Sequence, residues 1–334
     1  MKVVIIGAGS WGTALGKLLA EKGKDVYLLA RRKEVCESIN KRHENPFYLP
    51  RIKLPNNLKA TVEPNVLRKS ELIVLAVPSH ALRKTLKSLR DYLPEKPVPL
   101  VSTIKGIEEE TLATMSQVIK DVLFPEWHSF YTVLSGPSFA EEVARRLPTA
   151  VTIAGYEEEI TSFVQKTFAS QYFRTYRSLD VMGVELAGAL KNVIAIAVGI
   201  SDGLELGLNA RAALITRGLA EISRLGVKLG ANPLTFSGLA GMGDLVLTCT
   251  GSLSRNRTVG LRLGRGEKLK DILAGLTQVA EGVRTTASVR KLAQKVNVET
   301  PICEAVYQVL YKKENPYDMV STLLSRKLKQ EFDF

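Results

Sequence analysis

Short runs of apolar, mostly β-branched residues alternate with helix-like stretches over the first half of the chain. The runs expected to form strands are Val3–Ile6, Val26–Leu29, Leu72–Val77, Val98–Thr103, Tyr131–Leu134, Ala150–Ala154 and Phe173–Tyr176. Several of them are apolar at consecutive positions, a pattern typical of strands buried on both faces of a parallel sheet. Helical stretches lie between the runs, such as Thr13–Lys22, which Gly23 is expected to end. This order predicts a doubly wound α/β domain.

The strand pattern fades after about residue 178, and the remaining sequence is typical of helices. The expected helices are Val181–Gly199, Ala210–Leu229, Asn256–Leu263, Thr285–Lys295, Cys303–Lys312 and Tyr317–Lys329. Pro233, Pro301 and Pro316 stand where helices are expected to begin, because proline fits the first helical turn. We therefore expect an α/β domain over residues 1–178 and an all-α domain over residues 179–334. No linker rich in Pro, Gly or Ser separates them, so the two domains are expected to share a cleft.

Length and composition agree with two soluble domains. The chain has 334 residues, of which 45% are hydrophobic and 24% charged, enough for roughly two buried cores. Cys36, Cys249 and Cys303 are far apart and form neither a disulfide framework nor a zinc-binding motif. Apolar runs such as Leu72–Val77 are far shorter than the ~18 residues of a membrane helix. The first run ends at Gly7, short of the about 7–15 residues of a signal-peptide core, so we expect a cytoplasmic protein without membrane insertion.

Lysine and arginine exceed the acidic residues by 46 to 34, which gives a formal net charge of +12. The basic residues are scattered, and only 7% of the residues are aromatic, so the chain lacks the concentrated basic surface of a nucleic-acid-binding protein. We expect small anionic ligands instead. His43, His80 and His128 form no metal-ligand spacing, and no catalytic metal is expected.

A GxGxxG motif, Gly7-Ala8-Gly9-Ser10-Trp11-Gly12, directly follows the first expected strand and opens a helix. In such motifs the first glycine allows the tight turn, the second lets the backbone approach a pyrophosphate, and the third lets the helix pack on the strand. The helix N-terminus then offers N–H groups and partial positive charge to the phosphates. The motif predicts a dinucleotide site in an N-terminal domain of the Rossmann type.

The end of the second expected strand indicates which dinucleotide binds. An acidic residue is expected there when the ligand is NAD, but Arg31 and Arg32 follow Ala30 instead. Two guanidinium groups attract the 2′-phosphate of NADP. The sequence therefore favours NADPH, with NADH possible as a second cofactor.

Two lysines are candidate catalytic or substrate-binding residues. Lys191 is the one cationic residue of an apolar helical segment, on a face of mostly small residues, and burial lowers the pKa of a lysine toward neutral pH. The alternatives are a lysine that reaches solvent, or one paired with Glu185 or another carboxylate. Lys105 follows an expected strand, where an exposed ammonium can meet a substrate oxygen, although an ordinary surface lysine fits the same position.

Two later segments have the composition of phosphate-binding or active-site loops. Thr250–Arg257 places serine, arginine and asparagine at the start of an expected helix, where they can bind a phosphate. Gly238–Asp244 is expected to be a glycine-rich loop ending in one carboxylate. Asp244 could orient Lys191, bind a substrate hydroxyl or cap a turn.

Taken together, these motifs resemble the bacterial NAD(P)-dependent glycerol-3-phosphate dehydrogenase family over essentially the full chain. The matching segments are GAGSWGTAL (Gly7–Leu15), AVPSH (Ala76–His80), STIKGIE (Ser102–Glu108), SGPSFAEEV (Ser135–Val143), ELAGALKNVIAIAVGI (Glu185–Ile200), GLAGMGDLVLTCTGSLSRN (Gly238–Asn256) and VAEGVRTT (Val279–Thr286). The last four are specific to the family, since generic Rossmann enzymes lack them.

The resemblance implies reduction of dihydroxyacetone phosphate to sn-glycerol 3-phosphate for glycerophospholipid synthesis, by an enzyme expected to be a homodimer. Lys191 matches the family's proton donor and acceptor, and Lys105 matches its second, substrate-binding lysine. The other matching substrate positions are Gly136, Ser138, Asp244, Ser254, Arg255 and Asn256. The matching cofactor positions are Ser10, Trp11, Arg31, Arg32, Lys105, Ala140, Arg255, Val279 and Glu281.

Two other functions remain open at this point. One is a different two-domain Rossmann reductase that acts on another ketone or hydroxy acid. The other is a non-catalytic sensor of NADPH, which would need neither the two lysines nor the phosphate-binding segment.

Overall fold

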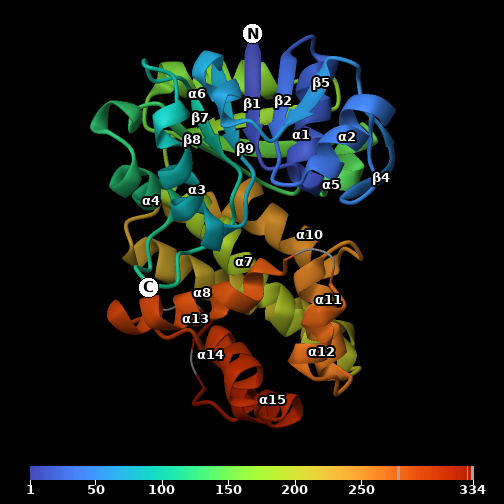
Figure 1. The fold of residues 1–334 in the computed structure, drawn as a ribbon. Coiled ribbons are helices and arrows are strands. Elements are labelled where there is room, and N and C mark those ends of the chain that lie inside the picture. The colour runs from blue at the N-terminus through green and yellow to red at the C-terminus, as the bar shows by residue number, and fades with distance from the viewer. Residues whose placement is uncertain (277–278, 329, 332–334) are drawn as a thin grey trace.

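A computed structural model describes residues 1–276, 279–328 and 330–331 of the chain. A sheet with flanking helices forms the N-terminal part, and a cluster of helices forms the C-terminal part (Figure 1). The eight strands of the sheet lie in the order β10-β9-β8-β7-β6-β1-β2-β5. Their bounds are β1 (Lys2–Ile6), β2 (Asp25–Leu29), β5 (Leu58–Thr61), β6 (Leu72–Leu75), β7 (Leu100–Ser102), β8 (Tyr131–Ser135), β9 (Thr149–Gly155) and β10 (Phe173–Ser178).

The sheet is mostly parallel, as predicted. Strands β5, β2, β1, β6, β7 and β8 run in one direction, β9 pairs antiparallel with β8, and β10 runs parallel to β9. Both faces are covered, which explains why the strands are apolar at consecutive positions. Val3 and Ile5 of β1 pack on one face with α1, which spans Ser10–Glu21. Val4 and Ile6 pack on the other face with two further helices, α3 (Leu82–Leu89) and α4 (Met115–Val122).

Three strands were not predicted from the sequence. One is the edge strand β5, and the other two are the antiparallel pair β3 (Glu44–Asn45) and β4 (Leu49–Lys53). These segments lack a continuous apolar run, because β4 contains Pro50 and exposed residues and β5 alternates buried and exposed positions. The remaining helices of this part are α2 (Lys33–Arg42), α5 (Ala140–Ala144) and α6 (Glu158–Phe168).

The C-terminal part is helical, as expected. Its helices are α7 (Val181–Gly203), α8 (Gly207–Lys228), α9 (Pro233–Ser237), α10 (Asp244–Thr250), α11 (Arg255–Gly264), α12 (Leu269–Ala274), α13 (Glu281–Lys295), α14 (Pro301–Tyr307) and α15 (Pro316–Leu324). Helices α9, α14 and α15 begin at the three prolines that were expected to start them.

Two expectations about this part were wrong. The glycine-rich segment before Asp244 is not a loop but a π-helical turn, Leu239–Gly243, that leads directly into α10. Gly241 packs against the backbone of Phe236, where a Cβ atom would not fit, and Asp244 is the first residue of a helix. The helix expected over Cys303–Lys312 is α14 followed by a second π-helical turn, Gln308–Lys312. Lys329, the expected end of the last helix, lies outside the described residues.

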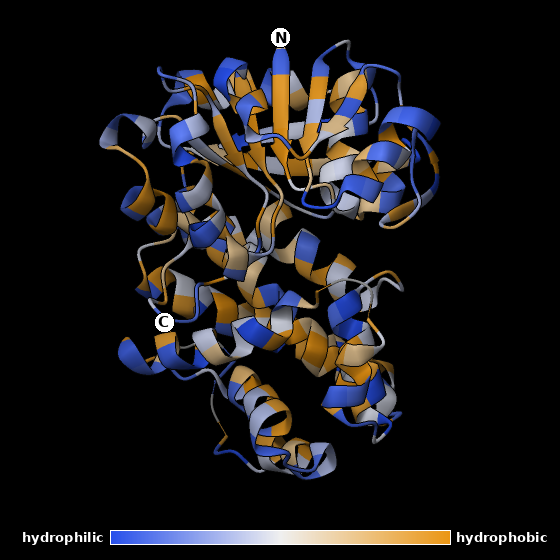
Figure 2. Ribbon diagram, in the orientation of Figure 1, coloured by the Kyte–Doolittle hydropathy of each residue, from blue (hydrophilic) through white to orange (hydrophobic). Residues whose placement is uncertain are grey.

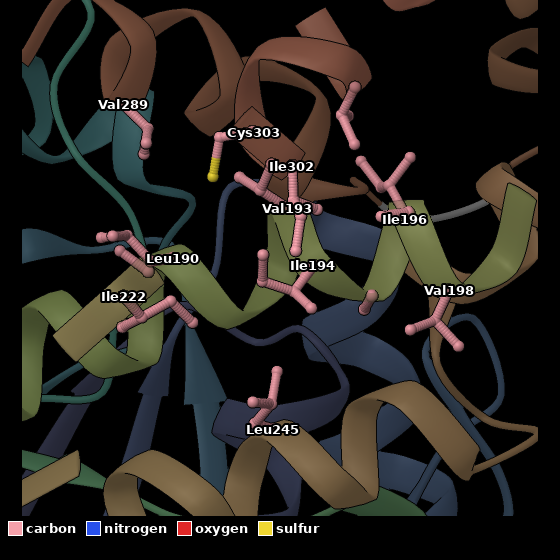
Figure 3. Packing of buried hydrophobic residues seen from close by; sticks show 14 of the residues in the cluster. Leu190, Val193, Ile194, Ile196, Val198, Ile222, Leu245, Val289, Ile302 and Cys303 are labelled. Carbon is pink, nitrogen blue, oxygen red and sulfur yellow. The ribbon is translucent and has the colours of Figure 1, made fainter. Parts of the chain in front are cut away.

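Helix α7 forms the centre of the helical part. Apolar residues cover it on all sides, and they pack against α8, α10, α13 and α14 through residues such as Ile222, Leu245, Val289 and Ile302 (Figure 3). By length and composition it is the one helix of the described chain that could cross a membrane, contrary to the sequence expectation, yet 89% of its most apolar window is buried in the protein. Figure 2 shows hydrophobic residues along the central strands and more hydrophilic ones on the outer helices. We therefore interpret α7 as a core helix.

Candidate active site

The glycine-rich loop joins β1 to the N-terminus of α1, as predicted. Gly7 has a φ of 117°, and a Cβ atom there would lie 2.5 Å from the carbonyl oxygen of Ala76, so the fold itself requires this glycine. Gly9 is the N-cap residue of α1, and a Cβ atom there would meet no other atom within 4 Å. Packing within the protein therefore does not require a glycine at position 9. A ligand that approaches the backbone closely would require one, because a side chain would stand in its way. Because the first turn of α1, Ser10 to Thr13, also holds no carboxylate, the loop fits the phosphates of a dinucleotide.

Arg31 and Arg32 lie next to this loop, beyond the end of β2. The N–H of Gly7 donates to the carbonyl oxygen of Leu29 at 3.0 Å, which ties the two strand ends together. Both arginines are exposed, and Arg32 is the N-cap residue of α2. The guanidinium of Arg32 lies over the Phe47 ring at 4.8 Å, and its Nε is 3.7 Å from Glu34 Oε2. The arginines therefore lie exposed beside the glycine-rich loop, at the carboxyl end of β2.

Asp244 brings the two candidate lysines together. Lys191 Nζ donates to Asp244 Oδ1 at 2.7 Å, and Lys105 Nζ donates to Asp244 Oδ2 at 2.6 Å. The side chain of Lys191 is 7% exposed and that of Asp244 is 2% exposed, whereas Lys105 is 20% exposed. Lys105 comes from the segment after β7 and the other two residues from α7 and α10, so the cluster joins both parts of the molecule.

The surroundings of the two lysines differ. Lys191 does not reach solvent and does not pair with Glu185. That carboxylate instead accepts hydrogen bonds from the Ser116 N–H at 2.8 Å, from Ser116 Oγ at 2.7 Å and from Tyr131 OH. Lys105 was expected to be an exposed ammonium, but it is largely buried because Asp244 and the carbonyl oxygen of Gly136, at 3.2 Å, hold its Nζ.

Burial sets the acidity of Lys191. The pKa of Lys191 is lowered to about 8, chiefly because burial desolvates the ammonium; the Asp244 carboxylate opposes this effect and the nearby ammonium of Lys105 adds to it. Lys191 Nζ also donates to Thr248 Oγ1 at 2.6 Å, and Thr248 Oγ1 donates to the carbonyl oxygen of Asp244 at 2.6 Å. The geometry therefore fixes the ammonium while leaving it able to lose a proton near neutral pH.

The expected phosphate-binding segment forms the start of α11. Ser254 is its N-cap residue, and its Oγ accepts the N–H of Arg257 at 3.2 Å. Arg255 is exposed, and its Nη1 donates to the carbonyl oxygen of Val279 at 3.0 Å. Asn256 is buried, and its Nδ2 donates to Asn192 Oδ1 at 2.9 Å. This contact places Asn256 beside the residue that follows Lys191 in α7.

The remaining candidate residues surround this cluster. Gly136 accepts both the Lys105 ammonium and, at 2.9 Å, the hydroxyl of Ser138, and Ala140 begins α5. Glu281 begins α13 and accepts the Ser79 N–H at 3.1 Å and the Ser79 hydroxyl. Within the described ranges, no group of three or more His, Cys, Asp or Glu side chains could hold a metal ion.

Sequence reasoning missed three polar residues of this region. Thr248 stands four positions after Asp244, a spacing that places both on one face of a helix, but no helix was predicted over Asp244–Thr250. Asn192 directly follows Lys191, and Ser79 lies within the AVPSH segment that was noted without a role. Their contacts cross between distant segments, so no local pattern marks them apart from the residues beside them.

Comparisons with known proteins agree with this arrangement. The family profile described as the NAD-dependent glycerol-3-phosphate dehydrogenase N-terminus matches residues 2–161, and the one described as its C-terminus matches residues 180–321. The glycerol-3-phosphate dehydrogenase (NAD(P)+) of Leptospira biflexa serovar Patoc is 53% identical over 332 residues, which cover 99% of each chain. That of Myxococcus xanthus is 52% identical over 332 residues, again with 99% of each chain covered.

A solved structure extends the comparison to the fold. The crystal structure of glycerol-3-phosphate dehydrogenase from Coxiella burnetii superposes with a TM-score of 0.91 at 40% sequence identity and covers 97% of this chain and 99% of its own. The two family profiles together span most of the chain, and the relatives are more than 50% identical over nearly all of it. Proteins that share only a fold do not reach this similarity in sequence. The chain belongs to the NAD-dependent glycerol-3-phosphate dehydrogenase family of oxidoreductases.

Proposed function

We propose that this protein reduces dihydroxyacetone phosphate to sn-glycerol 3-phosphate, with NADPH as the preferred reductant and NADH as a second one. The observation that carries the proposal is the Lys105–Asp244–Lys191 cluster beside the start of α11. A buried lysine poised to give up a proton, with further cations at hand for a phosphate, matches the needs of a phosphorylated ketone. The activity named for the relatives from Leptospira and Myxococcus supports the same choice.

Lys191 is proposed as the proton donor. The bound nicotinamide cofactor supplies a hydride to the ketone carbon, and negative charge then develops on the ketone oxygen. The ammonium of Lys191 stabilises that charge and donates the proton, and in the reverse direction its neutral amine accepts the proton. Asp244 and Thr248 orient this group through their contacts with Nζ. No metal is required, because the lysines supply the positive charge.

The substrate is proposed to lie between the two lysines and the start of α11. Lys105 binds a substrate oxygen, and Arg255 and Asn256 hold the phosphate with the help of Ser254, Gly136 and Ser138. Fixing the phosphate places the ketone at the right distance from the cofactor and from Lys191. A substrate without the phosphate loses this positioning.

The cofactor is proposed to bind along the carboxyl ends of β1 and β2. Gly7, Gly9 and Gly12 with Ser10 and Trp11 hold its pyrophosphate, and Arg31 and Arg32 bind its 2′-phosphate. Lys105, Ala140, Arg255, Val279 and Glu281 complete the site on the side of the helical part. The proposed cofactor site is thus built from both the N-terminal and the C-terminal part of the chain.

We also propose that the enzyme is a cytoplasmic homodimer and that its product is the precursor of glycerophospholipids. The family membership supports these proposals. The oligomeric state is tested by the molar mass of the purified protein in solution.

The deciding experiment measures oxidation of NADPH, and separately of NADH, by the purified protein with dihydroxyacetone phosphate. Phosphate-free dihydroxyacetone serves as the control substrate. We expect rapid oxidation that requires the phosphate and is faster with NADPH. Protein that binds NADPH but oxidises neither cofactor would instead favour another reductase or a sensor.

A further inference from the structure

Asn45 lies fully buried beneath the glycine-rich loop, on the short strand β3 that the sequence did not predict. Its Nδ2 donates to the carbonyl oxygen of Ala8 at 3.0 Å and to Thr13 Oγ1 at 2.8 Å. Ala8 stands between Gly7 and Gly9, and Thr13 lies at the start of α1. Asn45 thus contacts both the loop and the helix that are proposed to hold the pyrophosphate.

The chemistry of the contact decides how the amide of Asn45 is oriented. The carbonyl oxygen of Ala8 can only accept a hydrogen bond, so the NH₂ group must face it. In this orientation Asn45 Oδ1 is buried without a hydrogen-bond partner among the described residues. An unpaired buried oxygen lowers stability, so the two hydrogen bonds that Asn45 donates to the loop and to α1 are kept at the cost of leaving its own oxygen unpaired.

Holding the Ala8 carbonyl also orients the next N–H group. No peptide bond in the described residues is cis, and in a trans peptide the C=O and the N–H point in opposite directions. Because the Ala8 carbonyl points toward buried Asn45, the N–H of Gly9 points away from it. Gly9 is also the position at which a Cβ atom would meet nothing within 4 Å. The contact therefore turns a backbone donor toward the open side of the loop.

We infer that Asn45 is a positioning residue for cofactor binding, which holds the loop in the phosphate-binding conformation before the dinucleotide arrives. A loop that is ordered in advance loses less conformational entropy on binding, so the cofactor binds more tightly. Asn45 itself touches no cofactor atom in this account. The inference rests on the proposed dinucleotide site, and its ligand class is the pyrophosphate of NADPH or NADH.

Asn57 provides a matched control in the same part of the molecule. Its Nδ2 also makes two hydrogen bonds, here to the backbone carbonyl oxygens of Ala20 and Lys24, each at 2.8 Å. These acceptors lie at the opposite end of α1, away from the glycine-rich loop. Substitutions of Asn45 and Asn57 thus each remove two hydrogen bonds of a side-chain amide, at opposite ends of one helix.

The experiment compares Asn45→Ala and Asn45→Asp with Asn57→Ala and Asn57→Asp in the full chain. Aspartate keeps the shape of asparagine but turns a carboxylate oxygen toward at least one backbone carbonyl oxygen at each position. The dissociation constant of NADPH is measured by fluorescence titration, and stability by urea unfolding. The dissociation constant of NADPH is expected to rise about 10-fold or more in the Asn45 variants, because both buried hydrogen bonds of this side chain are lost. The Asn57 variants are expected to lose stability but to bind within about two-fold of the wild type.

The outcomes separate this inference from the proposed function. Wild-type protein that binds no dinucleotide would overturn both. If the wild type binds NADPH and the Asn45 substitutions weaken binding no more than the Asn57 substitutions do, the role of Asn45 alone is overturned. If neither Asn45 variant folds, Thr13→Val removes the hydroxyl that accepts from Asn45 and that itself contacts the Ala8 carbonyl oxygen at 3.4 Å. A several-fold rise in the NADPH dissociation constant is then expected, and an unchanged constant would overturn the inference.

Discussion

At the scale of single residues, the function depends on how one carboxylate holds two lysines. Asp244 fixes Lys191 in a buried position where its proton can be transferred. Lys191→Ala is expected to lower kcat by about 10²–10⁴-fold, the usual contribution of a general acid, while the affinity for NADPH stays nearly unchanged. Steady-state kinetics with dihydroxyacetone phosphate measure the first quantity and a fluorescence titration the second. Near-normal turnover would refute the assignment.

Lys22→Ala is a suitable control for that variant. The ammonium of Lys22 also has backbone partners, since it donates to the carbonyl oxygens of Lys166 and Ala169, but these lie on α6 and directly after it. Its turnover is expected to equal that of the wild type.

The lowered pKa of Lys191 predicts a pH dependence. Burial brings this pKa to about 8. Reduction needs the protonated ammonium, so kcat/KM for dihydroxyacetone phosphate should fall as the pH rises through about 8. Oxidation of glycerol 3-phosphate needs the neutral amine and should rise over the same range. Because the Asp244 carboxylate raises this pKa, Asp244→Asn should move both transitions to lower pH, and pH–rate profiles in both directions test this.

Arg31 and Arg32 predict the cofactor preference. Both are exposed at the end of β2, so replacing them should disturb the fold little. The Arg31→Ala, Arg32→Ala double variant should raise the KM for NADPH about 10-fold or more, because two charge-assisted hydrogen bonds to the 2′-phosphate are lost. The KM for NADH, which lacks that phosphate, should change by less than about two-fold. Equal changes for both cofactors would contradict the proposal.

Lys105, Lys191 and Asp244 could each be selected as candidates from the sequence, but the contacts between them could not be predicted. Lysines in unusual surroundings are visible locally, since Lys191 interrupts an apolar segment. The hydrogen bonds to Asp244 span 53 residues from Lys191 and 139 from Lys105. Such contacts follow from the way the helices pack, which no local pattern encodes. Asn45 escaped notice for the same reason, because its partners lie on the glycine-rich loop and α1.

At the scale of elements, the site depends on how closely α7 and α11 cross. A Cβ atom on Gly199 of α7 would fall against the carbonyl oxygen of Arg257, and one on Gly260 of α11 against that of Ile196. Backbone thus meets backbone at this crossing. Helix α7 carries Lys191 and α11 begins with Arg255 and Asn256, so the crossing sets the distance between the proton donor and the proposed phosphate-binding residues.

Adding one methyl group at this crossing should therefore affect both stability and function. Gly260→Ala is expected to destabilise the protein by about 1–3 kcal/mol through overpacking and to raise the KM for dihydroxyacetone phosphate. Gly275→Ala is the control, because a Cβ atom there has its nearest neighbour at 3.5 Å, an ordinary contact. Urea unfolding and steady-state kinetics of both variants make the comparison. Equal stability of the two variants would show that α7 and α11 can move apart without loss of stability.

The elements themselves were predictable where apolar residues repeat. Seven of the strands correspond to apolar runs, since burial on both faces leaves a clear pattern, and proline marked three helix starts. Strand direction was not predictable, because an apolar run such as Ala150–Ala154 reads the same whether β9 is parallel or antiparallel to its neighbour. The short polar strands β3 and β4 carry no such pattern. The glycines before α10 favoured the prediction of a loop where the structure has a π-helical turn.

At the scale of the whole molecule, the charge balance should influence how fast ligands bind. The protein carries a formal net charge of +12, and both proposed ligands are anions. Long-range attraction of this kind weakens as salt shortens the Debye length from about 30 Å at 0.01 M to about 8 Å at 0.15 M. We therefore expect kcat/KM for dihydroxyacetone phosphate to fall with added salt. Phosphate-free dihydroxyacetone, which is neutral, should show no comparable decrease.

The division of the chain follows from the same large-scale arrangement. Strand β10 ends at Ser178 and α7 begins at Val181, so we propose the boundary between residues 178 and 179. Contacts across it are extensive, as Lys105–Asp244 and Ser79–Glu281 illustrate. Expression of residues 1–178 alone, with NADPH binding as the readout, tests whether the first part folds independently.

The burial of α7 has a consequence for the synthesis of the protein. This helix emerges from the ribosome before α8 to α14, the elements that later surround it, have been made. Until then a strongly apolar segment of 23 residues is without its partners and is prone to aggregate. A nonsense mutation shortly after Gly203 would make that state permanent. The gene is therefore expected to tolerate truncation poorly at any point before the end of α14, even where the lost residues lie far from the substrate.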